Sequence, residues 1–303
     1  MEAVELDAEQ TEYISLRNDL LFHMVFTRNN AALKALLSVL LSIPIEMMGQ
    51  VDVLNPVQYS DVIRSKLTVL DLKVYLENGT YVLVEMQVRK FEYWTSRTLA
   101  YAARAVADQV SGKFNYGKLE PVIQISIMNY SLFPEHKRFF AKYTLKDEEG
   151  QEYTDKLRFY VMDLTQIGAA TTEQKEQGLV EWAKAFRANS WAEVNSIENS
   201  GVKEVVQTMQ MIMANPSERE MIRMLRDAEI DRRTEVSAAR RDGMARGKAQ
   251  GMAQGMAQGM AQGVARGKTQ GKTEMARILK REGVDPGIIA KSSGLTLEEI
   301  HAL

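Results

Sequence analysis

The sequence predicts an α/β protein in which helices flank a mixed β-sheet, followed by a helical C-terminal extension. Two runs rich in valine, leucine and tyrosine lie on either side of Glu77-Asn78-Gly79, which is the pattern of a β-hairpin. A helical stretch at residues 91–110 separates this hairpin from the apolar segment 121–130, and such a crossover adds a parallel strand to the sheet. Beyond residue 172 the apolar residues recur at helical spacing.

The composition is that of a globular protein with an appendage. The 303 residues exceed the length of one α/β domain of about 200–250 residues, and 45% are hydrophobic and 26% charged. The chain has no cysteine, which excludes disulfides and thiolate metal sites, and its acidic start lacks a signal-peptide pattern, so we expect a cytoplasmic protein. The most apolar segment, residues 31–48, is interrupted by Lys34, Pro44 and Glu46, so no membrane role is expected.

The first expected helix begins at Asn18 or Asp19, either of which can act as its N-cap, and runs to Arg28. A second helix is expected over residues 30–42, because Pro44 stops it. Leucine and other apolar residues recur on one face of both helices.

Polar residues interrupt the two strands of the expected hairpin: Asp71 and Lys73 in the first, Glu85 and Gln87 in the second. A two-residue Asn-Gly loop would place Asp71 and Glu85 on opposite faces of the sheet. A three-residue loop with Gly79 in the left-handed conformation pairs them directly. We favour the three-residue loop, because one face is then wholly apolar and the other holds every ionisable group of the strand centres.

This register predicts a metal site. Directly opposed carboxylates have Cβ atoms about 4.5–5.5 Å apart and repel each other unless a cation lies between them. Mg²⁺ prefers oxygen ligands and leaves room for waters and a substrate phosphate, and Mn²⁺ can substitute for it. We therefore expect Asp71 and Glu85 to bind Mg²⁺.

The helix at residues 91–110 is expected to cover the sheet, and residues 121–130 to form a central strand whose Gln124 faces either the site or a polar neighbour. Residues 138–145 and 157–164 are expected to be further strands. The helical residues expected to face the sheet are Tyr93, Leu99, Ala102, Ala103, Val106 and Val110.

The C-terminal part carries a repeat with glycine at every fourth residue from Gly243 to Gly271. Residues 240–280 contain nine basic and two acidic side chains, a local charge of +7 in a chain of net charge −2. The repeat is compatible with a marginal helix, a flexible spacer or a basic helix that pairs two protomers. We expect a domain at 1–240, the repeat at 241–273, and a helix-turn-helix-like module at 274–303 that favours homo-oligomer formation over reading bases.

The spacing from Asp71 to Glu85-Met86-Gln87 resembles the signature of the PD-(D/E)XK nuclease superfamily. The segments Asn18-Asp19-Leu20-Leu21-Phe22, Tyr93-Trp94-Thr95-Ser96-Arg97 and Pro121-Val122-Ile123-Gln124-Ile125-Ser126-Ile127 are similar to the recombination-promoting nuclease (Rpn) or putative transposase family, over roughly residues 15–240. Leu70 and Gln87 stand where the superfamily has proline and lysine.

The resemblance implies a restriction-endonuclease-like fold and a Mg²⁺-dependent DNA endonuclease active in DNA recombination. It implies that Arg97 and Tyr101 bind the substrate backbone and that Asp19 adds a carboxylate to the metal site, unless Asp19 is only a helix cap. Gln87 could orient the attacking water but carries no charge, which Lys73 would then supply, unless Lys73 is only a surface lysine.

Two other hypotheses remain open. The chain could be a weakened nuclease scaffold that binds DNA or assembles without cutting it, which the missing lysine favours. Asp71 and Glu85 could instead pair with Lys73 and Arg97 in a buried charge network that serves stability alone.

Overall fold

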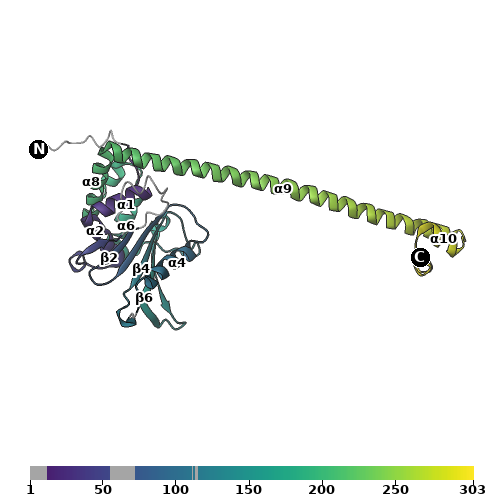
Figure 1. Ribbon diagram of the computed structural model, residues 1–303, viewed down its shortest axis with the longest axis horizontal. Helices are drawn as coiled ribbons and strands as arrows, with labels where there is room; N and C mark the ends of the chain where they lie inside the picture. The colour runs from purple at the N-terminus through teal and green to yellow at the C-terminus, as the bar shows by residue number, and fades with distance from the viewer. Residues whose placement is uncertain (1–11, 55–71, 111, 113–114) are drawn as a thin grey trace. The chain divides into compact units, whose positions relative to one another are not determined.

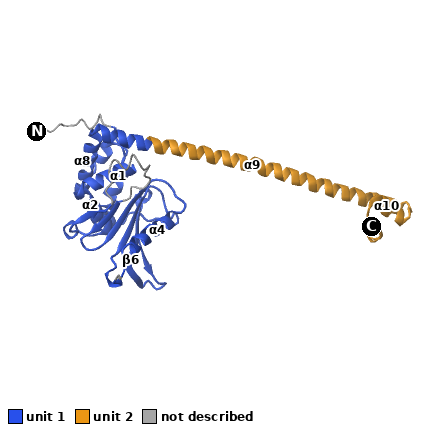
Figure 2. Cartoon of the chain, viewed as in Figure 1, with its two compact units in different colours: residues 1–226 blue, residues 227–303 orange. Residues whose placement is uncertain are grey.

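The computed structural model describes residues 12–54, 72–110, 112 and 115–303. The chain divides into two compact units, residues 1–226 and residues 227–303 (Figure 2).

The first unit is built on a six-stranded mixed sheet, in the order β1-β2-β3-β4-β6-β5. The contacts of β4 with β3 and with β6 are parallel, and the other three pairings are antiparallel. The predicted α/β fold with a mixed sheet flanked by helices is confirmed. The strands are β1 (Val51–Val53), β2 (Leu72–Leu76), β3 (Tyr81–Gln87), β4 (Val122–Met128), β5 (Phe140–Lys146) and β6 (Glu152–Asp163).

The β2–β3 hairpin has the predicted register over its described residues. Leu72 pairs with Val84 and Tyr75 with Tyr81. The loop has three residues, because the Leu76 amide donates to the Thr80 carbonyl at 3.0 Å and Gly79 has a φ of +89°. Asp71 lies outside the described residues, so its pairing with Glu85 stays a prediction.

The first helix begins where its predicted cap places it. Asn18 caps the first helix, because its side chain accepts from the Leu21 amide at 2.9 Å, and Asp19 is therefore the first helical residue, not the cap. The helices are α1 (Asp19–Arg28), α2 (Asn30–Leu41), α4 (Trp94–Ala107), α5 (Thr172–Glu176), α6 (Leu179–Arg187), α7 (Trp191–Asn195) and α8 (Ser200–Ala214), with 3₁₀ turns at Ile45–Met47, Tyr116–Lys118 and Leu164–Ala169.

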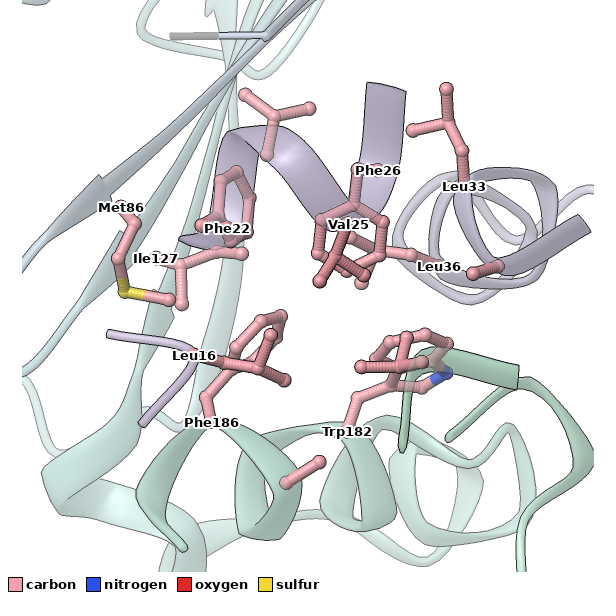
Figure 3. Close-up of a cluster of buried hydrophobic side chains, with 14 of the residues drawn as sticks. Leu16, Phe22, Val25, Phe26, Leu33, Leu36, Met86, Ile127, Trp182 and Phe186 are labelled. Atoms are coloured by element: carbon pink, nitrogen blue, oxygen red, sulfur yellow. The ribbon is translucent and has the colours of Figure 1, made fainter. Parts of the chain in front are cut away.

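The two faces of the sheet are covered differently. Helices α1, α2, α6 and α8 lie together on one side of the sheet (Figure 1). They contribute to one large core that includes the inward side chains of β2, β3 and β4. In that core Phe22 and Phe26 of α1 pack near Trp182 and Phe186 of α6, with Met86 on the sheet side (Figure 3). Helix α4 covers the other face through a small cluster of Ala102, Ala105 and Val122.

Helix α9 (Pro216–Arg281) begins in the first unit and continues into the second. The repeat at 241–273 is helical, and its side chains from 241 to 272 are exposed. Helices α10 (Pro286–Ser293) and α11 (Leu297–His301) pack on the end of α9 around Ala276, Ile289 and Ile300. The predicted division into the three segments 1–240, 241–273 and 274–303 stays a prediction. In the described part of the chain, no helix has both the length and the apolar character that a membrane crossing requires.

Candidate active site

Glu85 lies near the end of β3 on the face that α4 covers. Its side chain is only 3% exposed, and its Oε1 accepts from Arg97 Nη2 at 2.6 Å. Arg97 comes from the first turn of α4, and its side chain is 25% exposed. Burial of a carboxylate is costly unless a cation and hydrogen bonds compensate its charge, and Arg97 supplies both. The Glu85–Arg97 ion pair is one of the contacts expected under the hypothesis of a buried charge network.

Arg97 is held in place by three aromatic rings. Its guanidinium carbon lies 5.4 Å from the ring centroid of Trp94, 5.8 Å from that of Phe91 and 5.3 Å from that of Tyr101. A guanidinium at such distances is attracted to the ring faces. The rings therefore restrict where Arg97 can direct its charge, and they keep it beside Glu85.

The neighbouring strand contributes two buried polar side chains to the same face. Ser126 pairs with Glu85 across the parallel β3–β4 ladder and accepts a hydrogen bond from the Trp94 indole at 3.3 Å. Gln124, two residues earlier and 2% exposed, has an Oε1 with no hydrogen-bond partner among the described residues. A buried amide oxygen of this kind is rare and marks the site as polar.

Tyr130 follows β4 and contacts the segment just before α4. Its hydroxyl accepts from the Phe91 amide at 3.2 Å. Burial raises the pKa of Tyr130, and the negative charge of Glu85 acts in the same direction. The phenol therefore stays protonated and adds no second negative charge near Glu85.

Gln87 and Lys73 lie on the predicted face. Gln87 is half-buried, two residues after Glu85, and its Nε2 donates to the Arg89 carbonyl at 2.8 Å. Lys73 pairs with Leu83 across the hairpin, and its Nζ lies 5.9 Å from the Tyr81 ring centroid. The amide oxygen of Gln87 can accept a hydrogen bond, but the positive charge of the superfamily lysine is missing there.

The donor atoms of this face suit a hard cation, because Glu85, Gln87 and Ser126 all carry oxygen. Within the described ranges there is no group of three or more acidic or histidine side chains that could hold a metal ion. Asp19 is exposed, and its helix packs into the core on the opposite face of the sheet. The assignment of Asp71 and Asp19 as metal ligands stays a prediction.

The face of α4 that packs on the sheet differs from the predicted one. Tyr93, Leu99, Ala103 and Val110 are exposed, whereas Ala102 is buried and Val106 partly buried, as expected. The buried residues of the helix are Trp94, Thr98, Ala102 and Ala105. Their spacing of four, four and three residues is helical and could have identified them, but the prediction placed the larger apolar side chains inside. Trp94 and Tyr130 were also missed as neighbours of Glu85.

No curated protein and no solved structure matches the chain. The model of one protein family, described as PD-(D/E)XK nuclease family transposase, matches residues 16–239, which include the sheet, α4 and every described side chain of the site. The chain therefore belongs to the PD-(D/E)XK nuclease family transposases.

Proposed function

We propose that the chain is a Mg²⁺-dependent DNA endonuclease that hydrolyses phosphodiester bonds with a metal-activated water. The observation that carries this proposal is Glu85, a carboxylate buried on the polar face of a nuclease-family sheet beside a cation and buried polar groups. Buried charge inside a strand is costly, and a site for chemistry gives it a reason.

Each side chain has a role in this proposal. Asp71 and Glu85 would hold the metal. When bound, Mg²⁺ lowers the pKa of a coordinated water and neutralises charge on the scissile phosphate. Gln87 orients the attacking water through its amide, and Lys73, on the same face, provides the charge that Gln87 lacks.

Arg97 and Tyr101 are proposed to act together on the substrate backbone. Arg97 Nη2 donates to Glu85, and a quarter of the Arg97 side chain is exposed. A guanidinium has five N–H donors, so Arg97 can hold the carboxylate and contact a phosphate at once. Tyr101 packs against that guanidinium.

Cleavage of supercoiled plasmid with and without Mg²⁺ tests the proposal. We expect Glu85→Gln and Asp71→Ala to lower the rate by at least about 100-fold, and EDTA to abolish cleavage. Mn²⁺ should restore activity after EDTA treatment. Glu148→Gln is the matched control. Glu148 is an exposed acid in the loop between β5 and β6, so this variant should cut at the wild-type rate.

A second function, a DNA-binding or assembly scaffold without catalysis, is favoured by glutamine in the lysine position. It predicts that wild type and both site variants retain plasmid in a gel-shift experiment and leave it uncut. Equal cleavage by wild type and both variants would instead reject Asp71 and Glu85 as the site.

We further propose a homo-oligomer through the C-terminal helices and a role in DNA recombination in the cytoplasm. Four large apolar side chains of the C-terminal module are about half or more exposed, which supports self-association. They are Met275, Ile278, Ile288 and Leu297. Sedimentation of wild type against Ile288→Glu tests this, since a wild-type monomer would contradict it.

A further inference from the structure

Three aromatic side chains, two just before α4 and one in its middle, are exposed next to the candidate active site. We call Phe91, Tyr93 and Tyr101 the aromatic patch, and their exposed fractions are 41%, 64% and 37%. The rings of Phe91 and Tyr93 meet edge to face, with centroids 6.3 Å apart. Exposed aromatic rings that cluster, unlike single ones, indicate a binding surface.

The patch is connected directly to Glu85. The guanidinium of Arg97 contacts the rings of Phe91 and Tyr101 and, through its Nη2, the carboxylate of Glu85. Only the Arg97 side chain therefore separates a ligand that lies on these rings from Glu85, where the scissile phosphate is proposed to bind.

Basic residues surround the patch. Arg89 and Lys90 precede Phe91, and Arg104 is exposed one turn after Tyr101, whereas Glu92 is the acidic residue between the rings. This mixture of rings and cations matches a ligand with flat π-faces on an anionic backbone. In a paired duplex the faces of the bases are stacked inside, so only unpaired bases present them to a protein.

We propose that the aromatic patch stacks the unpaired bases of a single-stranded DNA segment beside the phosphate that the active site cuts. The inference rests on the proposed function and names its substrate as a strand end, a bulge or a melted segment. Stacking tolerates every base, so this surface positions DNA without reading its sequence.

Fluorescence anisotropy in EDTA, where nothing is cut, tests the proposal on the full-length chain. The probes are a labelled DNA strand, the same strand fully paired, and the same duplex with an unpaired bulge. We expect the single strand and the bulged duplex to bind at least about tenfold more tightly than the paired duplex. The RNA strand of the same sequence should bind no more tightly than DNA.

The variants Phe91→Ala and Tyr93→Ala should each raise the Kd of the single strand by about tenfold and leave the Kd of the paired duplex unchanged. Tyr93→Phe should bind as wild type, because it keeps the ring. Tyr153→Ala is the control, since Tyr153 lies on β6 with 87% exposure and should not affect binding. A strand containing 5-iodouracil should crosslink to Phe91 or Tyr93 under long-wavelength light.

Equal affinity for the single strand and the duplex, or wild-type binding by both alanine variants, would overturn the inference. Tighter binding of RNA would overturn the choice of DNA. If the chain cleaves plasmid but shows no preference for unpaired DNA, the proposed role of the aromatic patch is wrong and the proposed nuclease function still stands. If binding of unpaired DNA depends on the rings but the chain never cuts DNA, the role of the aromatic patch stands and the proposed nuclease function is wrong.

Discussion

The two faces of the β2–β3 hairpin use adjacent residues for opposite purposes. The face toward α1 carries Leu72, Val74, Val82, Val84 and Met86, all buried in the main core. The face toward α4 carries Lys73, Glu85 and Gln87, with Glu85 buried against an arginine. Because side chains alternate along a strand, one hairpin can support the fold on one side and hold charge on the other.

The helices above these faces differ in the same way. The core face meets large side chains such as Phe22 and Trp182, which exclude polar groups. The other face meets α4 mainly through Trp94, Thr98 and two alanines. Small residues let the helix approach the sheet near Val122, and Trp94 and Arg97 then surround Glu85 at the end of β3. The small cluster under α4 leaves space for polar side chains on that face, whereas the large side chains of the main core fill the opposite face.

The largest expected change in stability comes from one of two neighbouring substitutions on β2, which together test the difference between the faces. Leu72→Ala should lower the free energy of unfolding by about 4 kcal/mol, because the removed side chain is fully buried and leaves a cavity. Lys73→Ala should lower it by less than about 1 kcal/mol, since Lys73 is part-exposed and loses only contacts such as that with the Tyr81 ring. Urea unfolding followed by circular dichroism measures both values.

The same two variants separate stability from chemistry. Lys73→Ala should cleave plasmid more slowly than wild type, whereas folded Leu72→Ala should cleave normally. Equal losses of stability at the two positions would refute the division between the faces. Cleavage by Lys73→Ala at the wild-type rate would remove its proposed role.

The next test concerns the ion pair on the polar face. Arg97→Met should cost about 3 kcal/mol of stability, because it leaves the buried Glu85 carboxylate without its cation. The double variant Glu85→Leu/Arg97→Met removes both charges and should regain most of that loss. Thermal unfolding of the two single variants and the double variant gives their coupling energy.

Plasmid cleavage distinguishes the two possible roles of the Glu85–Arg97 pair, a part of a metal site or a charge network for stability. If Glu85 holds a metal, the restored double variant stays inactive in the plasmid assay. A double variant as stable and as active as wild type would favour a charge network that serves stability alone.

Much of the fold was predictable because its signals are local. Asn18, Pro44 and the Glu77-Asn78-Gly79 loop fixed helix ends and hairpin register through capping and turn conformation. The start of β6 was missed, because Glu152 begins the strand within a charged stretch whose solvent-facing residues show no apolar alternation.

The site was only partly predictable, because its remaining contacts are not local. The parallel register of β3 and β4 brings Ser126 beside Glu85, and no turn between the strands specifies that register. The predicted orientation of α4 was wrong, because it followed the rule that large apolar side chains face inward. Tyr93 and Leu99 are exposed and do not follow that rule. That rule fails where a surface serves binding, as we propose for the aromatic patch.

The smallest expected effect tests the turn that separates the two faces. Gly79→Ala should cost about 2 kcal/mol, because alanine at a φ of +89° is strained and its Cβ would lie 2.7 Å from Glu120 Oε1, which accepts from Tyr75. Gly150→Ala is the matched control, since Gly150 has the same φ with no atom within 4 Å, and should cost about 1 kcal/mol. Urea unfolding of both variants measures the difference. Equal costs would show that Glu120 moves aside freely, and a stabilised Gly79→Ala would contradict the left-handed turn on which the assignment of the two faces depends.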